Sequence, residues 1–401
     1  MKLPAVRVNE QGRPFLENGQ MWMYRNNLIL HDENVKDGDI VRIESEDGKF
    51  IASGFYSDCS HIAVRILSRN EHDVFDRAFF EKRIQAAFDF RKATNYDNLR
   101  SCRMIYSEAD LLPGFIADLY QDILVTQVSC SGMEQRKQMI YDIIRNVLGA
   151  EGIEIHGIYE RNDIAARAKE GLEQYKGFYG KSESSPQVVI NENGLLLNVD
   201  IENGQKTGYF LDQKSNRMLI RHYAKGMKVL DCFTHTGGFA LNAALGNAEH
   251  VSAVDVSKTA LDQAYANACL NHLEDRMEFI QADVFEYLDE IQEGQFDLII
   301  LDPPAFTKSR KTVFKAYNGY KRINKRAMEV LKNGGFLATC SCSRYMETSL
   351  FEQMLKEAAL EAGVLLKQVS VTQQNSDHPV LWQNDETSYL KFYIFQILNA
   401  C

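Results

Sequence analysis

The stretch that decides the fold reads V-L-D-C-F-T-H-T-G-G-F-A-L-N-A-A over residues 229–244. An apolar strand ends at Asp231, a tight turn carries Gly237 and Gly238, and an apolar helix follows. In doubly wound sheets, ligands bind beyond the carboxyl ends of the strands, where glycines let them approach the backbone. The turn lacks the G-x-G-x-x-G spacing of nicotinamide and flavin sites, so a different ligand is expected.

Outward from this unit, apolar strands alternate with helix-length segments from about residue 225 onward. The first five strands are separated by segments long enough for helices, which predicts a doubly wound parallel sheet. No clear helix separates the last two, so the final strand is expected to run antiparallel beside its predecessor. The seven expected strands are Lys228–Phe233, His250–Val256, Met277–Ala282, Phe296–Leu301, Gly335–Cys340, Leu365–Val371 and Tyr389–Ile397.

The part of the chain before this domain has other patterns. Residues 1–72 contain short alternating strands with a hairpin signal at Asp47-Gly48, and they predict a small β-barrel. Residues 73–200 begin with an expected linking helix over 74–99 and continue with mixed strands and helices, which indicates a middle α+β domain. Residues 201–401 are then the doubly wound domain.

Composition excludes several classes of protein. The chain has 401 residues, of which 45% are hydrophobic and 25% charged, values that are ordinary for globular domains. No run of about 18 apolar residues exists and the N-terminus lacks a signal-peptide core, so we expect a cytoplasmic protein without membrane contact. The eight cysteines form no C-x-x-C pair, so neither a metal nor a disulfide framework is expected. The net charge of −10 argues against binding nucleic acid over the whole surface.

Four successive strands end in an acid, namely Asp231, Asp255, Asp283 and Asp302. Asp255 suits the two hydroxyls of a ribose, and Asp283 is placed to accept a hydrogen bond from an adenine amino group. An acid-lined pocket suits the sulfonium cation of S-adenosylmethionine better than a phosphate chain, which prefers basic or backbone donors. The alternative is that each Asp only caps the helix that follows it.

The chemical end of the predicted site combines a carboxylate with thiols. Asp302 precedes Pro303-Pro304, a pair of prolines that makes the turn rigid. The fifth strand ends at Cys340 and Cys342, which share one face of the strand and are therefore not distinguished by the pattern. A thiol beside Asp302 is a candidate nucleophile, whereas the alternative is that both cysteines are inert core residues.

A basic stretch follows the two prolines. Residues 307–328 hold many cations and no acid, in a chain whose net charge is negative. This pattern predicts a track for a nucleic-acid backbone, with a solvated helix face as the alternative. The cations are Lys308, Arg310, Lys311, Lys315, Lys321, Arg322, Lys325 and Arg326, and the interleaved aromatic residues are Phe314, Tyr317 and Tyr320.

Together these motifs resemble class I S-adenosylmethionine-dependent RNA methyltransferases of the ribosomal RNA large-subunit methyltransferase I type, which form 5-methylcytosine. That family has an N-terminal RNA-binding PUA barrel, a middle α+β domain and a Rossmann-like methyltransferase domain, which agrees with the three parts above. The N-terminal match is weaker, because Gln20-Met21-Trp22 stands where relatives tend to have His-Pro-Trp. The matching stretches are residues 208–217, 230–239, 301–306, 339–343 and 377–380.

The resemblance implies S-adenosylmethionine as methyl donor, S-adenosylhomocysteine as product, ribosomal RNA of the large subunit as substrate, and no metal; it also allows a homodimer. Thr339-Cys340-Ser341 resembles the Thr-Cys-Ser of cytosine-5 methyltransferases and favours Cys340 over Cys342 as the nucleophile. The cofactor-binding residues implied are Phe210, Asp212, Gln213, Arg217, Asp231, Phe233, Thr234, Gly237, Gly238, Asp255, Val256, Asp283, Val284, Asp302 and Pro303.

The mechanism expected from this resemblance is addition of the Cys340 thiolate to C6 of a flipped cytosine, while Asp302 holds N3 and the exocyclic amine. Phe306 would stack on the base. Ala305 and Phe306 replace the second cysteine that assists product release in many such enzymes, so release needs another route.

Two other functions remain open. Asp-Pro-Pro followed by an aromatic residue also resembles amino-group methyltransferases, in which no thiol is needed. A non-catalytic RNA-binding assembly factor that holds the cofactor is the other alternative. The role of Asp377-His378 is open as well, since these residues could serve the site or hold the loop before the last strand.

Overall fold

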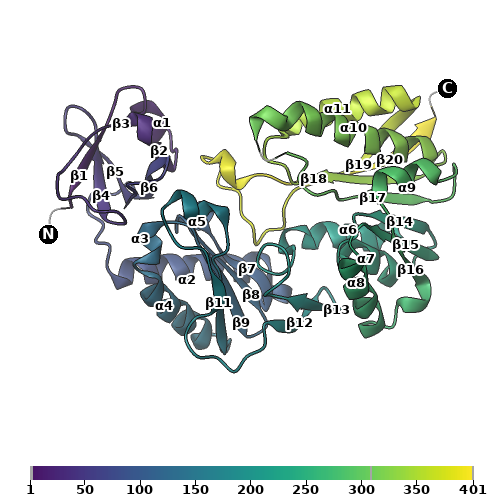
Figure 1. The fold of residues 1–401 in the computed structure, drawn as a ribbon, viewed down its shortest axis with the longest axis horizontal. Coiled ribbons are helices and arrows are strands. Elements are labelled where there is room, and N and C mark those ends of the chain that lie inside the picture. Colours follow the sequence, from purple (N-terminus) through teal and green to yellow (C-terminus); the bar gives the residue numbers. More distant parts are fainter. Residues whose placement is uncertain (1–2, 308, 400–401) are drawn as a thin grey trace. The chain divides into compact units, whose positions relative to one another are not determined.

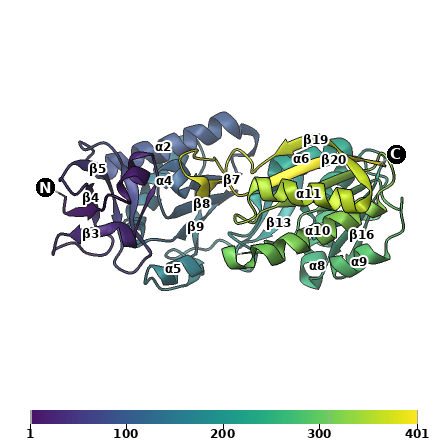
Figure 2. The same ribbon diagram turned by 90° about the horizontal axis from the view of Figure 1, so that it is seen from above.

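The computed structural model describes residues 3–307 and 309–399. The chain forms two compact units (Figures 1 and 2). The first consists of Met1–Ile190, Val199–Leu211 and Ser376–Thr387, and the second of Asn191–Asn198, Asp212–Asn375 and Ser388–Cys401. Among the helices described, none has the length and apolar character that crossing a membrane requires.

The first unit begins with a six-stranded barrel-like sheet in the order β2-β6-β5-β4-β1-β3. The predicted hairpin at Asp47-Gly48 is confirmed, because β4 and β5 pair antiparallel across it and Gly48 has a φ of 80°. The elements are β1 (Ala5–Val8), α1 (Arg13–Glu17), β2 (Trp22–Tyr24), β3 (Leu28–His31), β4 (Ile40–Glu44), β5 (Phe50–Tyr56) and β6 (Ile62–Ser68).

A five-stranded sheet in the order β11-β10-β9-β8-β7 follows in the same unit, with α2 and α4 packed together. Ile40, Phe55 and Leu67 of the barrel share one hydrophobic core with α2, α4 and this sheet, so barrel and middle domain pack as one body. The elements are α2 (Arg77–Thr94), β7 (Ser101–Tyr106), β8 (Phe115–Tyr120), β9 (Ile123–Val128), α3 (Ser131–Glu134), α4 (Lys137–Ala150), β10 (Gly157–Arg161), α5 (Ala165–Lys169) and β11 (Lys176–Phe178).

The helix expected over 74–99 is shorter than predicted. Asp76 is its N-cap and accepts a hydrogen bond from the Phe79 amide at 3.1 Å, so the helix begins at Arg77. It ends at Thr94, because Asn95 leaves the helical conformation. The hairpin of β12 (Gln187–Glu192) and β13 (Leu195–Asp200) comes after the middle domain, and its residues are divided between the two units.

The second unit contains the predicted doubly wound sheet, with seven strands in the order β16-β15-β14-β17-β18-β20-β19. All neighbouring pairs from β16 to β18 are parallel, and β20 runs antiparallel to both β18 and β19. This confirms the seven predicted strands and the antiparallel last strand, which lies between β18 and β19. The strands are β14 (Lys228–Cys232), β15 (His250–Asp255), β16 (Met277–Gln281), β17 (Leu298–Leu301), β18 (Phe336–Ser341), β19 (Val364–Thr372) and β20 (Lys391–Asn399).

Helices cover both faces of this sheet: α6, α7 and α8 lie on one side, and α9, α10 and α11 on the other (Figure 1). All four residues of β17 are buried, as expected for a central parallel strand. The helices are α6 (Lys214–Tyr223), α7 (Gly238–Leu245), α8 (Lys258–Leu270), α9 (Val284–Glu290), α10 (Val313–Val330) and α11 (Thr348–Ala362). Short 3-10 turns are η1 (Arg25–Asn27), η2 (Tyr96–Asn98), η3 (Ser107–Asp110), η4 (Leu211–Gln213), η5 (Glu274–Arg276), η6 (Arg310–Thr312) and η7 (Asp385–Thr387).

The segment Ser376–Thr387 belongs to the first unit, although the residues on either side of it belong to the second. Asp377 fastens it there: one carboxylate oxygen accepts the Arg103 amide at 3.1 Å, and its carbonyl accepts Arg91 Nη2 at 2.9 Å. The other carboxylate oxygen accepts His378 Nδ1 at 2.8 Å. Because Asp377 and His378 are both buried, the pair has a structural role as the anchor of this segment.

Replacing Asp377 with Ala should loosen the 376–387 segment. The substitution removes the acceptor of a buried amide, which costs about 1–3 kcal/mol. A protease binds several residues around its cleavage site in an extended conformation, which a loosened segment adopts more easily. Trp382 is 88% exposed, so chymotrypsin should cut after it roughly tenfold faster in the variant than in the parent. Cleavage rates followed by mass spectrometry measure this. Asp385→Ala, an exposed position in the same segment, is the control, and equal rates for both variants would refute the anchor.

Candidate active site

The turn after β14 has an unusual backbone. Phe233, His235 and Gly237 have φ values of 63°, 51° and 86°, so every second residue is left-handed. At Gly237 a Cβ atom would also lie 3.1 Å from the Cβ of Ala264, which explains the glycine. Left-handed conformations at non-glycine residues cost about 1–3 kcal/mol each and cluster at ligand-binding turns. The predicted strand-turn-helix ligand site is therefore built into a strained loop.

Asp231 organises this turn from inside the protein. Its Oδ2 accepts the Thr234 hydroxyl at 2.6 Å and the Ala240 amide at 2.9 Å, so it fixes both the turn and the start of α7. Its Oδ1 is buried without a partner among the described residues. Burial, and next to it the charges of Asp302 and Asp255, raise the pKa of Asp231 to about 7. The carboxylate thus serves as a helix cap and still has one oxygen that suits a cationic or hydrogen-bond-donating ligand.

Asp255 and His235 form the neighbouring part of the site. Asp255 accepts the His235 amide at 2.9 Å and the Ser257 amide at 2.9 Å. Burial lowers the pKa of His235, Asp255 opposes this shift and the charge of Arg217 adds to it. His235 was not among the predicted site residues. The only sign of its role in the sequence is its position in the turn between β14 and α7.

The remaining predicted residues of strands β15 and β16 have different surroundings. Val256 is 68% exposed directly after β15, so its apolar side chain is open to a flat ring. Asp283 is exposed and accepts the Phe285 amide at 2.8 Å, which is the capping alternative considered above. Val284 packs in the hydrophobic core of the unit, so only its backbone could meet a ligand.

Two of the predicted residues between Phe210 and Arg217 have structural partners. Asp212 is buried and accepts the Tyr389 hydroxyl at 2.5 Å. Arg217 forms a buried, two-pronged ion pair with Glu192, both N–O distances being 2.6 Å. Phe210 belongs to the first unit.

Gln213 lies beside Asp302 and Cys340, the two residues predicted to carry the chemistry. Its Nε2 donates to Asp302 Oδ1 at 3.2 Å and lies 3.5 Å from Cys340 Sγ. Asn216 Nδ2 donates to Gln213 Oε1 at 2.6 Å, which fixes the orientation of the amide. The sequence analysis placed Gln213 among cofactor contacts, whereas the structure brings it to the thiol and the carboxylate.

Cys340 and Asp302 are in direct contact. The thiol donates to Asp302 Oδ1 at 2.8 Å. Burial raises the pKa of Cys340 well above its usual value, and the Asp302 carboxylate raises it further. The resting sulfur is therefore a protonated thiol whose proton already faces a carboxylate. Cys342 is half-buried on the following turn.

Lys391, on the neighbouring strand β20, was also missed by the sequence analysis. It is buried and donates from Nζ to the carbonyls of Ser343 at 2.9 Å and Met346 at 2.6 Å. Burial lowers its pKa to about 8, while the nearby thiols of Cys342 and Cys340 act in the opposite direction. It holds the loop that follows the candidate nucleophile. A lone lysine at the start of an apolar strand was the only signal in the sequence.

Phe306 lies in an aromatic cluster of the same unit. Its ring centroid is 4.6 Å from that of Tyr320, and 6.0 Å and 6.5 Å from those of Phe285 and Phe233. The ring is half-buried, so part of its surface is accessible. Pro303 is buried directly after Asp302, as expected for a rigid turn.

Half of the predicted basic track is wrong. Lys321 pairs with Glu361 at 2.8 Å and Arg322 with Asp289 at 3.0 Å. Lys325 and Arg326 likewise form ion pairs with acids of α9, α10 and α11. Tyr317 and Tyr320 are buried core residues. Helical periodicity turns these side chains toward neighbouring helices, which a linear run of cations does not show. Lys308 lies outside the described residues.

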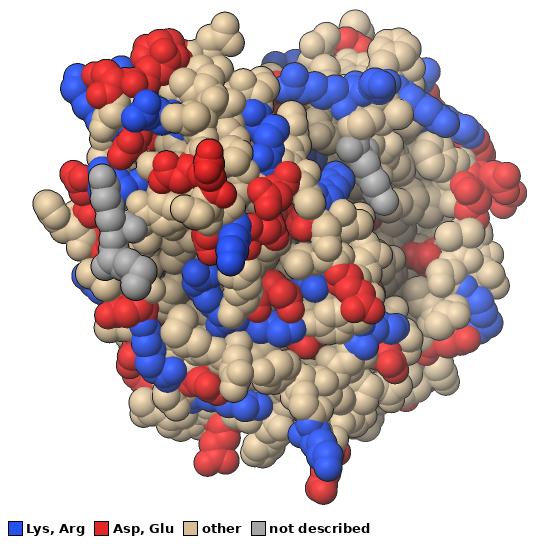
Figure 3. Space-filling view, turned by 60° about the vertical axis from the view of Figure 1, so that its left-hand side comes forward, with Lys and Arg blue, Asp and Glu red and all other residues tan. Residues whose placement is uncertain are grey.

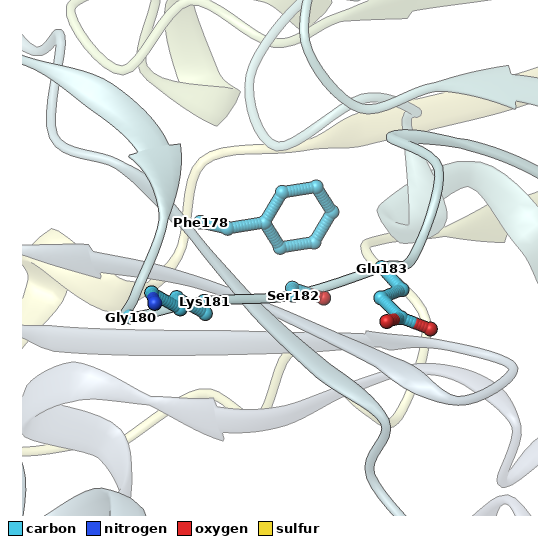
Figure 4. A pocket seen from close by; sticks show the side chains of 5 residues that line it. All are labelled: Phe178, Gly180, Lys181, Ser182 and Glu183. Atoms are coloured by element: carbon cyan, nitrogen blue, oxygen red, sulfur yellow. The ribbon is translucent and has the colours of Figure 1, made fainter.

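A cavity of about 570 Å³ is found elsewhere, in the first unit. Figure 4 shows the Phe178 ring above the chain of Gly180–Glu183, which lines it. This lining has one lysine, one serine and one glutamate and contains none of the predicted site residues. Among the described residues no cluster of His, Cys, Asp and Glu could hold a metal ion.

Comparison with known proteins agrees with this geometry. Residues 179–396 match the family described as S-adenosylmethionine-dependent methyltransferases, and residues 6–69 match the PUA-like domain. The chain is 40% identical over 375 residues to ribosomal RNA large subunit methyltransferase I of Aeromonas salmonicida, covering 92% of this chain and 93% of that one. It is 39% identical over 383 residues to the protein of the same name from Vibrio vulnificus, covering 94% and 95%.

Among solved structures, one assigned as a methyltransferase and crystallised with S-adenosylhomocysteine has a TM-score of 0.82 at 24% identity, with 99% of this chain and 100% of that chain covered. One assigned as an S-adenosylmethionine-dependent methyltransferase from Streptococcus mutans has a TM-score of 0.80 at 23% identity, with the same coverage. These two likenesses show the fold. With a PUA-like barrel in its N-terminal part and a doubly wound sheet whose strands end in acids, the chain belongs to the S-adenosylmethionine-dependent methyltransferases and, within them, to the ribosomal RNA large subunit methyltransferase I family.

Proposed function

We propose that this protein methylates C5 of a cytosine in large-subunit ribosomal RNA, with Cys340 as nucleophile. The observation that carries the proposal is the 2.8 Å hydrogen bond from Cys340 Sγ to Asp302 Oδ1, at the carboxyl ends of adjacent strands. The relatives named ribosomal RNA large subunit methyltransferase I support the RNA substrate. The cytoplasm is part of the same proposal, because a ribosomal RNA substrate would be met there.

The chain's own residues account for the activation of the base. Cytosine C5 is a poor nucleophile until a group adds at C6. Asp302 takes the Cys340 proton and passes it to N3 of the cytosine while sulfur bonds to C6, so no isolated thiolate has to persist in a buried site. Gln213 donates to the same carboxylate oxygen and keeps it pointed at the thiol.

S-adenosylmethionine supplies a methyl group on a positively charged sulfur. With the cofactor bound, the electron pair that sulfur addition places on C5 would form the bond to the methyl carbon. The bond from that carbon to the sulfonium would break, its electrons would return to sulfur, and S-adenosylhomocysteine would leave. Loss of the C5 proton to solvent restores the C5–C6 double bond and expels the Cys340 sulfur, and the N3 proton returns to it through Asp302. The target base must leave any helix to reach the site, at a cost of a few kcal/mol unless it is already unpaired.

The residues of the turn after β14 fit this cofactor. Asp231 has a buried carboxylate oxygen without a partner among the described residues, which an ammonium or sulfonium group would satisfy. Asp255 and the exposed side chain of Val256 at the end of β15 suit a ribose and an adenine ring. We propose Thr234, Gly237 and Gly238 as the backbone wall of the same pocket.

The Cys340→Ala variant should lose 5-methylcytidine formation by at least about a thousandfold, because the nucleophile is gone. Cys342→Ala is the matched control and should keep activity within a few fold. Both are incubated with S-adenosylmethionine and unmodified large-subunit ribosomal RNA, which is then digested for nucleoside mass spectrometry. A methylated guanosine or adenosine as the product, or full activity of Cys340→Ala, would refute the thiol mechanism.

Cofactor binding should release protons near neutral pH. Burial holds the pKa of Asp231 at about 7 without cofactor, and a cation beside Oδ1 favours the ionised form and lowers that pKa. Below pH 7 binding must therefore expel a proton, so affinity rises with pH and levels off above pH 7. Calorimetric titration in two buffers of different ionisation enthalpy measures the release.

In that titration, Asp231→Asn should abolish this contribution to proton release and weaken binding roughly tenfold or more, since its oxygen no longer carries a charge. Asp275→Asn, which alters an exposed acid in η5 before β16, is the control and should titrate like the parent. Buffer-independent heats for the parent protein would contradict a role for Asp231 in holding the cation.

A further inference from the structure

Three cations in η6 and the first turn of α10 have no side-chain partner among the described residues. Arg310, Lys311 and Lys315 are exposed and form no ion pair or side-chain hydrogen bond with any described residue. The cations on the later turns of the same helix are satisfied by acids, for example Lys321 by Glu361. The predicted basic track is therefore reduced to residues 309–315.

An aromatic side chain, Phe314, lies among these cations in the sequence. Phe314 is 78% exposed, whereas Tyr317 and Tyr320 on the same helix are buried. A ring this exposed buries little of its surface in the free protein, and cations flank it on both sides in the sequence. An aromatic face beside positive charges is the arrangement that binds single-stranded nucleic acid, because each base has a face that can stack and each linkage carries a phosphate.

The backbone of residues 309–315 is held in place before any ligand arrives. The Thr307 hydroxyl bonds to the Ser309 carbonyl at 2.7 Å and to the Thr312 hydroxyl at 2.7 Å. The Ser309 and Thr312 hydroxyls are 3.2 Å apart. This hydroxyl network fixes the turn η6 and the direction in which α10 begins, so little ordering entropy opposes binding.

Residues 309–315 are also connected to the part of the site that contains Asp302 and Cys340. It follows Asp302 by only a short stretch that contains the two prolines, and the ring of Phe306 packs on α10, where a Cβ at Gly319 would lie 3.2 Å from it. RNA held at residues 309–315 therefore lies on the same edge of the sheet as Cys340 and Asp302.

The basic segment of residues 309–315 belongs to a chain that is acidic overall. The net charge is −10, and over most of the face in Figure 3 the two signs alternate, with a row of Lys and Arg side chains only at the upper right. Residues 306–328 contain no acid. A local basic segment beside the site is thus the feature that attracts a phosphate chain.

We propose that residues 309–315 bind an unpaired stretch of the RNA substrate, with one base stacked on Phe314 and phosphates at Arg310, Lys311 and Lys315. The proposal rests on the RNA substrate of the proposed function and is independent of which atom is methylated. The segment recognises a single-stranded backbone and a base face, so it sets affinity and placement and not the identity of the target base.

Two triple variants with the same charge change test the cations. One is Arg310→Gln, Lys311→Gln and Lys315→Gln; the control is Lys321→Gln, Arg322→Gln and Lys325→Gln, whose cations are paired internally. Filter binding of unmodified large-subunit ribosomal RNA is measured from about 50 to about 200 mM salt. The first variant should reduce the slope of log affinity against log salt by about 2, since each phosphate contact contributes about 0.7. Equal slopes for the two triple variants would overturn the proposal.

Phe314 is tested by three single substitutions. Phe314→Tyr should bind RNA like the parent, whereas Phe314→Ala and Phe314→Leu should bind roughly five- to hundredfold more weakly, because loss of one stacked base costs about 1–3 kcal/mol. Equal affinity of Phe314→Leu and the parent would overturn the stacking role. Melting temperatures confirm folding, and Phe314 is exposed, so none of these changes removes core packing.

Failure of the RNA-binding proposal can be distinguished from failure of the proposed cytosine mechanism. Binding and salt slopes are measured without cofactor and without product, so they are unaffected by the identity of the methylated nucleoside. In turnover, the Arg310/Lys311/Lys315 variant should raise KM with little change in kcat, whereas Cys340→Ala should leave RNA affinity unchanged and abolish product. A variant that lowered kcat alone would contradict a binding role for residues 309–315.

Discussion

The active site depends on the register of two parallel strands. Leu301 of β17 pairs with Thr339 of β18, so the next residues, Asp302 and Cys340, end side by side and their side chains meet at 2.8 Å. A one-residue shift would turn every side chain of a strand to the other face. The completely apolar β17, buried on both sides, makes such a shift costly. The thiol and the carboxylate are thus positioned by the core of the sheet, and Asn216 orients Gln213 beside them.

The cofactor side of the same edge shows a second constraint. The turn after β14 tolerates left-handed residues at Phe233 and His235 because Asp231, buried beneath it, accepts hydrogen bonds from both the turn and α7. That carboxylate keeps one oxygen without a partner among the described residues. Strain and an unsatisfied acid are both costs in the free protein, and a cationic cofactor held at Asp231 as proposed would relieve the second one. Stability and cofactor binding would then be linked at this residue.

Much of the fold followed from local pattern. Short apolar runs separated by helix-length segments identified the seven strands of the sheet, because a parallel strand covered on both faces is apolar along its whole length. Two predictions about helices were wrong. The aromatic residues Tyr317 and Tyr320 were assigned to RNA, yet helical periodicity turns them into the core. The helix over 74–99 was too long because its cap, Asp76, lay inside the predicted range.

The sequence by itself determined the class of sheet, the acids at the strand ends and the pairing of a thiol with Asp302, since each of these depends on the order of residues along one chain. Tertiary structure alone decided that Gln213 joins the thiol and that Lys391 holds the following loop. It also decided that Lys321 is paired, whereas the cations of residues 310–315 have no partner in the described part of the chain. The reason is physical: hydrogen bonds and ion pairs depend on distances of a few ångström between residues far apart in sequence, and only the packed fold sets those distances.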